Sequence, residues 1–119
     1  MAERQEFGRK NEKRAVKFLR AHKHRIIKCN YLARGGEIDI ISVTYPKTLV
    51  FTEVRSKHSC KHGHPAETIN AEKQRRIRTA AQQFLYENKK YQNYDCRFDV
   101  VTIVGEAKNM ILEYFPDAF

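Results

Sequence analysis

The stretch at residues 35–57, GGEIDIISVTYPKTLVFTEVRSK, constrains what this chain can fold into more than any other part of its sequence. It is rich in β-branched and aromatic residues, which favour strands, and the turn-forming residues 45–48 divide it in two. The stretch therefore predicts two strands joined by a tight turn. Charged side chains lie inside this apolar run, and burying a charge is costly unless it is paired or binds a metal. We interpret these charged positions as a functional site.

The alternation of side chains along a strand determines which of these charges lie together. On the later strand, Glu53, Arg55 and Lys57 share one face. With the turn centred near Pro46, Asp39 of the earlier strand lies opposite Glu53 to within about one residue. The sequence therefore predicts two carboxylates and a cation at one end of a short sheet.

Hydrophobic periodicity predicts the rest of the architecture. Outside the hairpin, the expected elements are a helix at 6–23, a strand at 25–32, a helix at 69–88, a strand at 96–104 and a short strand at 110–114. The expected order is αβββαβ with a final strand or coil, which makes the chain α/β. A length of 119 residues fits one domain, and we expect that domain to cover residues 1–119.

A third acid, Glu12, stands out in the first predicted helix. It lies three and four residues before the apolar Ala15 and Val16, so we expect it to project from the buried side of the helix. The alternative is that Glu12 only pairs with a nearby arginine or supports the helix dipole.

The chain is basic, with a net charge of +9 and a pI near 9.6. Residues 1–28 hold ten Lys and Arg against three acids, and residues 55–78 hold seven against two. Such an uneven basic surface attracts polyanions, and nucleic acid is the default partner. A basic protein that meets the ribosome or a membrane surface is the alternative.

Other features of the composition bear on the compartment. No apolar run approaches the roughly 18 residues that a membrane helix needs, so we expect no membrane partner. The charged N-terminus does not resemble a secretory signal. Three widely spaced cysteines argue against a disulfide framework, and we expect a cytoplasmic protein.

The paired acids fit the chemistry of metal-assisted phosphodiester cleavage. Mg²⁺ prefers oxygen ligands, and Asp39 and Glu53 on neighbouring strands can share one Mg²⁺ or Mn²⁺. Glu12 can complete the metal shell, directly or through water. Such a metal activates a bound water and offsets charge in the transition state. Arg55 lies on the face of Glu53, where a cation can hold the phosphate.

Several motifs of this chain together resemble those of a known protein family. The segments GGEIDII, VFTEVRSK and CRFDVV, the closing DAF and the early GRKNEKRA occur together in this order. In this arrangement the chain resembles the YraN family of small bacterial proteins over nearly its whole length. That family is in turn similar to archaeal Holliday junction resolvases and to the restriction-endonuclease-like PD-(D/E)XK nuclease superfamily.

The resemblance implies a restriction-endonuclease-like fold, with a mixed central sheet flanked by helices. It also implies a site of Glu12, Asp39, Glu53 and the basic position Arg55, with Lys73 nearby. The nuclease pattern has Lys where this chain has Arg55, and arginine cannot give up a proton. Lys57, one step further along the same face, either substitutes for that Lys or contacts the DNA backbone.

Basic residues around this site are the expected contacts to nucleic acid. The residues that we assign to this role are Arg9, Lys13, Arg34, Lys57, Lys73 and Arg76. We expect DNA in preference to RNA. A homodimer would suit a branched DNA.

A second constellation, His58, Cys60, His62 and His64, contains residue types that bind Zn²⁺. Ligands at every second residue do not match a zinc-finger spacing, and the chain has no CxxC pair, although Cys29 and Cys96 are also present. We therefore do not expect a zinc site. We expect loop residues at the rim of the cleft.

The leading hypothesis is a metal-dependent DNA endonuclease, selective for branched DNA, with Glu12, Asp39, Glu53, Arg55 and Lys57 as its catalytic residues. A non-catalytic DNA- or RNA-binding module that keeps the nuclease fold is the first alternative. An adaptor that binds an acidic protein partner is the second.

Overall fold

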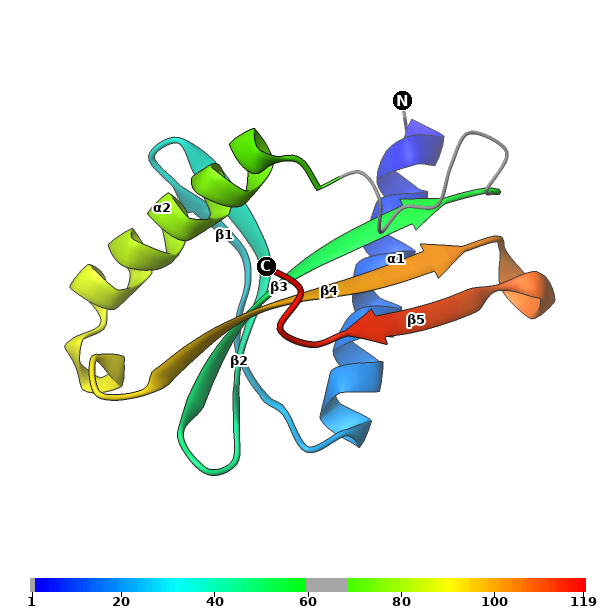
Figure 1. Cartoon of the computed structure of the whole chain (residues 1–119). Helices are drawn as coiled ribbons and strands as arrows, with labels where there is room; N and C mark the ends of the chain where they lie inside the picture. The colour runs from blue at the N-terminus through cyan, green and yellow to red at the C-terminus, as the bar shows by residue number, and fades with distance from the viewer. Residues whose placement is uncertain (1, 60–68) are drawn as a thin grey trace.

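The computed structural model describes residues 2–59 and 69–119. Two helices and five strands follow one another along the chain (Figure 1). Their bounds are α1 Ala2–Ala21, β1 Arg25–Ala33, β2 Gly36–Thr44, β3 Thr48–Lys57, α2 Ala71–Glu87, β4 Asp95–Val104 and β5 Ile111–Phe115. Short 3-10 turns, η2 at Lys89–Tyr91 and η3 at Ala107–Asn109, come before and after β4.

The five strands form one mixed sheet in the order β1-β2-β3-β4-β5. All neighbouring strands are antiparallel except β3 and β4, which run parallel. A parallel pair needs a long crossover, and α2 lies within the connection between β3 and β4. The expected α/β class, a mixed central sheet flanked by helices, is confirmed, and the final element is a strand.

The largest boundary difference concerns α1, which begins at Ala2 and not near residue 6. Hydrophobic periodicity misses this extension because residues 2–6 contribute no apolar stripe. No described helix is long and apolar enough to cross a membrane.

Two hydrophobic cores lie on opposite faces of the sheet. On one face, Phe84 and Ile77 of α2 pack against Phe51 of β3 and its neighbours. On the other, Leu19 of α1 packs with Ile40 and neighbouring residues of β4. In Figure 1, α1 passes behind β3, β4 and β5, whereas α2 lies beside the β1–β2 hairpin. The apolar side of each helix therefore faces the sheet.

The sheet divides at β2 and β3, and this fork positions the candidate site. The pairing of β2 with β3 ends at Ile40 and Thr52. Beyond that point β2 continues with β1 alone, up to the pair Gly36 and Ala33. The β1–β2 hairpin bends toward α2, away from the far end of β3 (Figure 1). We call this divergence the fork.

Contacts with α2 hold the bent hairpin in place. The Tyr31 hydroxyl donates to Glu87 at 2.7 Å, and the Arg34 backbone N–H donates to Gln83 at 3.0 Å. Gly36 lies so close to α2 that an added Cβ would meet the Arg76 carbonyl oxygen at 2.7 Å. Only glycine allows this approach without moving one of the two backbones.

This close approach predicts that Gly36→Ala destabilises the protein by about 1–3 kcal/mol, because overpacking forces backbone shifts. Urea unfolding monitored by circular dichroism measures the change. Gly8→Ala in α1 is the matched control, since a Cβ there meets nothing within 4 Å. That control is expected to stabilise the helix by about 0.5–1 kcal/mol. Equal midpoints for Gly36→Ala and the wild type would contradict the prediction.

Candidate active site

Asp39 and Glu53 stand together at the fork. They are the next residues on β2 and β3 after the last paired positions, Ile40 and Thr52. This placement agrees with the register expected from the turn. Beyond the fork β2 no longer pairs with β3, and Asp39 Oδ2 accepts the backbone N–H of Val54 at 2.8 Å. The Asp39 carboxylate thus takes the place of a missing strand contact.

The two carboxyl groups perturb each other. Burial, followed by the charge of Glu53, raises the pKa of Asp39 to about 8, against the lowering effect of the Val54 hydrogen bond. Burial also raises the pKa of Glu53, while the charges of Lys73 and Arg55 oppose the increase. A hydrogen bond with Asp39 also acts to lower the pKa of Glu53. Such a bond requires a proton on one of them, since two close carboxylates resist joint ionisation.

Lys73 is a cation in direct contact with Glu53. Its Nζ lies 3.7 Å from Glu53 Oε1, where the Glu53 side chain is 8% exposed and the lysine 43%. Asn70 caps α2 by accepting the Lys73 backbone N–H at 2.8 Å, which places this lysine in the first turn. The first turn of α2 therefore places the Lys73 amine beside the Glu53 carboxylate on β3.

The two cations on β3 lie at different distances from the pair. Arg55 is two residues beyond Glu53 and acts on it electrostatically. Lys57 is four residues beyond, which is about 13 Å along an extended strand. Of these two, Arg55 is the cation close to the carboxylates, and Lys57 lies at the far end of the strand.

Glu12 lies at the edge of the site, not on the buried side of α1 as expected. The buried residue in that turn is Asn11, and Glu12 is partly exposed. Burial raises the pKa of Glu12, and a hydrogen bond from the Asn30 side chain opposes the increase. Glu12 is close enough to Asp39 to raise the pKa of that residue further.

Asn30 also contributes to the site, although the sequence did not predict it. It lies in β1 between Cys29 and Tyr31, whose partners on β2 flank Asp39. Its φ of 54° is the left-handed conformation that asparagine tolerates better than most residues. No signal in the sequence singled out this asparagine, because its contact with Glu12 depends on how α1 packs.

A basic groove of about 500 Å³ extends from Glu12 between α1 and β1. Its lining residues are Arg9, Glu12, Lys13, Val16, Lys17, Arg20, Cys29 and Asn30. The four cations are spaced by four, four and three residues, which puts them on one face of the helix. Arg9 and Lys13 were expected from the sequence, and helical spacing was the signal for the other two, Lys17 and Arg20.

A second hollow of about 330 Å³ lies on the α2 side of the hairpin tip. Its lining residues are Leu32, Gly35, Gly36, Glu37, Lys73, Arg76 and Ile77. Arg76 also pairs with Glu72 at 3.2 Å. Arg34 is exposed in the turn beside this hollow and does not line it. Basic side chains thus flank the carboxylates on both sides.

The structure does not gather a complete metal cage. Among residues 2–59 and 69–119, no three His, Cys, Asp or Glu side chains come together closely enough to hold an ion by themselves. Of the zinc-type residues, Cys60, His62 and His64 lie outside the described part of the chain. The His58 ring pairs with Glu106 at 3.0 Å and stacks on Phe7. Cys29 and Cys96 are exposed free thiols on different strands.

The family described as "Uncharacterised protein family UPF0102" matches residues 11–103, a range that contains all three acids of the site. The chain belongs to this family. UPF0102 proteins similar to it come from Chromohalobacter salexigens, Hahella chejuensis and Caldicellulosiruptor bescii. Their identities are 42%, 44% and 40%, over 94%, 96% and 94% of this chain. The matches cover 89%, 90% and 95% of those proteins.

The raised pKa of Asp39 makes the stability of this UPF0102 protein depend on pH. Below about pH 4 the Asp39 carboxyl is protonated in both the folded and the unfolded state, and its contribution to stability is fully present. As the pH rises toward the folded pKa of about 8, the unfolded state ionises first and this contribution is lost. We expect stability in EDTA to fall by more than about 1 kcal/mol between pH 5 and pH 8.

Urea unfolding at the two pH values tests this expectation. Asp39→Asn removes the titrating group, so its midpoint is expected to change less with pH than that of the wild type. Asp95→Asn, at an exposed position at the start of β4, is the control and keeps the wild-type dependence. If the stability of Asp39→Asn changed with pH as steeply as that of the wild type, another group would be the cause of the pH dependence.

Proposed function

We propose that this protein is a metal-dependent DNA endonuclease whose active site lies at the fork between β2 and β3. The observation that carries this proposal is the convergence of Asp39 and Glu53, with Lys73 at 3.7 Å from Glu53. Perturbed carboxyl groups beside a positioned cation are characteristic of catalytic sites. Basic grooves on both flanks supply the surface that a polyanionic substrate requires.

The carboxyl groups fit a divalent cation. Both have raised pKa values because they are buried together, and a cation between them offsets the repulsion that burial strengthens. Asp39 and Glu53 would hold Mg²⁺ or Mn²⁺, with Glu12 at the outer edge through water. A bound metal would supply an activated water and neutralise charge on the phosphate.

Lys73 supplies an amine to a site that has Arg55 where the nuclease pattern has lysine. Arginine at the usual lysine position can hold a phosphate but does not exchange a proton at neutral pH. Lys73 brings an amine to the same carboxylate from α2. In this proposal Arg55 orients the phosphate, and Lys73 stabilises the developing charge and exchanges the proton. Lys57, further along β3, contacts the DNA backbone.

The path of the nucleic acid follows the cations on either side of the carboxylates. Arg9 and Lys13 meet the phosphates along α1, while Arg76 and Arg34 do so beside the hairpin tip. A strand crossing between these two flanks passes over Asp39. We infer DNA as the substrate, in branched form, from the likeness to Holliday junction resolvases. Two copies related by a two-fold axis would present two such sites to a branch.

The second candidate is a nucleic-acid-binding module that does not cut. The observations that favour it are the arginine at position 55 and the engagement of Glu12 with Asn30, outside a closed metal cage. Such a module binds DNA or RNA in a salt-dependent manner and has no metal-dependent activity.

Cleavage assays distinguish the two candidates. We expect the wild type with Mn²⁺ to cut branched DNA faster than flapped or linear DNA, because the resembling resolvases act on branches. Asp39→Asn is expected to lower the rate at least about 100-fold, and Lys73→Met by about 100-fold through loss of acid–base and charge stabilisation. Product formation on labelled DNA measures each rate.

Two control variants accompany this assay. Asp95→Asn removes an exposed acid at the start of β4, and Lys108→Met removes an exposed lysine in η3. Both are expected to keep the wild-type rate within about threefold. Equal rates for the wild type and Asp39→Asn would place the activity at another site or in a contaminant.

Metal binding provides a separate prediction that needs no substrate. Calorimetric titration with Mn²⁺ is expected to show one site in the wild type and at least about tenfold weaker binding in Glu53→Gln, since a carboxylate ligand is lost. Asp95→Asn is again the control with wild-type affinity. A wild type that binds no Mn²⁺ would favour the non-cutting module.

A further inference from the structure

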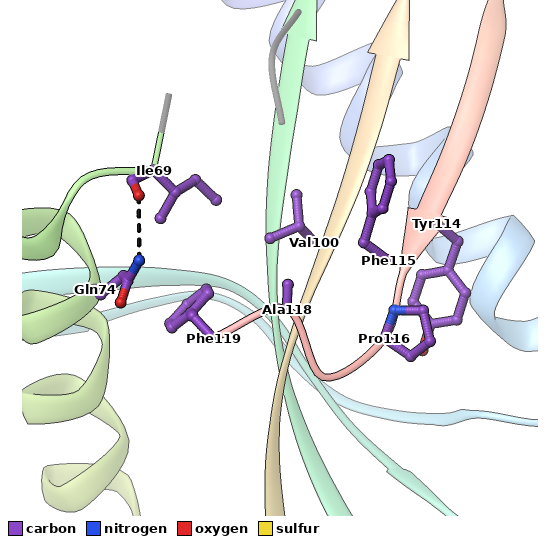
Figure 2. A pocket seen from close by; sticks show the side chains of 8 residues that line it. All are labelled: Ile69, Gln74, Val100, Tyr114, Phe115, Pro116, Ala118 and Phe119. Carbon is purple, nitrogen blue, oxygen red and sulfur yellow. Dashed lines mark hydrogen bonds between the residues drawn. The ribbon is translucent and has the colours of Figure 1, made fainter. Parts of the chain in front are cut away.

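A third cavity, of about 400 Å³, lies between the start of α2 and the C-terminal segment. Its lining residues are Ile69, Gln74, Val100, Tyr114, Phe115, Pro116, Ala118 and Phe119 (Figure 2). In the figure, the C-terminal segment crosses β4, and Phe119 extends toward Gln74 of α2. This cavity is distinct from the basic groove between α1 and β1 and from the hollow beside the hairpin tip.

The cavity adjoins the carboxylates. Val100 on its floor is the partner of Glu53 in the parallel β3–β4 pairing. Neighbouring strands lie about 4.8 Å apart, and paired residues point to the same face, so Val100 and Glu53 lie side by side. On the opposite wall, Gln74 directly follows Lys73 in α2. A ligand in the cavity therefore lies next to the Glu53–Lys73 contact.

The walls are held in place before any ligand binds. The Phe119 ring stacks on Phe98 with centroids 5.4 Å apart, and the Arg78 guanidinium lies 4.7 Å from Phe98 and 5.6 Å from Phe119. Backbone hydrogen bonds fix the C-terminal segment, from Asp117 N–H to Asp99 and from Ala118 N–H to the Phe98 carbonyl. The cavity is thus preformed, as small-molecule sites generally are.

The chemistry of the lining selects the kind of ligand. Phe115 and Phe119 are partly exposed, so they offer aromatic surface to a ligand. One amide accompanies them, since Gln74 Nε2 donates to the Ile69 carbonyl at 3.2 Å, which orients that side chain (Figure 2). Aromatic surface with a single oriented amide suits a flat, neutral, hydrogen-bonding ring. It does not suit an anion, because none of these lining residues carries a positive charge.

We propose that this cavity takes one unpaired nucleobase of the strand whose phosphate lies at Asp39 and Glu53. The inference rests on the proposed function, because it takes the site for nucleic acid as given. A nucleobase is flat and neutral, and it is tethered to the phosphate that the neighbouring cations hold. Every base has a face that stacks on an aromatic ring, so the cavity accepts the base without reading sequence. The substrate strand is therefore single-stranded beside the cleaved bond.

Binding without cleavage tests this inference. Fluorescence anisotropy in EDTA compares two labelled strands of equal length and charge, an oligothymidylate and a strand of abasic residues. We expect the wild type to bind the oligothymidylate about tenfold more tightly, since stacking of one base contributes about 1–3 kcal/mol. Phe119→Leu, which keeps an apolar side chain, is expected to reduce that ratio to about twofold or less. Tyr86→Leu, at an aromatic residue 78% exposed on α2, is the control and keeps the tenfold ratio.

Equal binding of the two strands by the wild type, or the same ratio in Phe119→Leu and the wild type, would overturn the inference. A second measurement uses no variant. Titration of the wild type with thymidine is expected to shift the aromatic NMR signals of Phe115 and Phe119 and to leave that of Phe7 unchanged. Unshifted signals at both residues would also overturn it.

The outcomes separate this inference from the endonuclease proposal. A preference for the base-bearing strand that disappears in Phe119→Leu supports the cavity, even if no DNA is cut with Mn²⁺. Metal-dependent cutting without that preference supports the endonuclease and overturns the cavity as a nucleobase site.

Discussion

The hydrogen bond from the Val54 backbone N–H to Asp39 is the interaction on which the candidate site depends. Where β2 leaves β3, the backbone of β3 would otherwise face the fork without a partner, and unpaired buried backbone groups are costly. A carboxylate satisfies this group and is thereby fixed beside Glu53. The same residue that makes the divergence of the strands tolerable thus holds the charge that the proposed chemistry requires.

Much of the architecture follows from local pattern. The turn near Pro46 sets the register, and side-chain alternation then brings Asp39 and Glu53 together, because both rules act over a few residues. The fork itself was not predictable in this way. It depends on the hairpin tip meeting α2, where Gly36 approaches Arg76, and these residues are far apart in the sequence. The assignments of Arg9, Lys13 and Lys57 to nucleic acid stay predictions.

The positions of the cations and of Glu12 likewise depend on how the helices pack on the sheet, which local sequence pattern does not determine. Sequence order places Arg55 near Glu53, but the contact of Lys73 with Glu53 requires α2 to begin at one particular place on the sheet. Periodicity put Glu12 on the buried side of α1, whereas the structure buries Asn11 and turns Glu12 toward Asn30. One residue around a helix is a rotation of about 100°, which a short apolar stripe does not resolve.

The two carboxylates of the pair are held to the rest of the sheet through different neighbouring strands. Glu53 lies on an interior strand that is paired with β4 along its whole length. Asp39 lies on β2 just where that strand has lost one of its two neighbours. Glu53 is therefore tied to the sheet through β4, whereas Asp39 is tied to it through β1 and through its hydrogen bond with Val54 of β3. A change that weakens the contacts of the hairpin tip with α2 would therefore act on Asp39 directly, through its own strand.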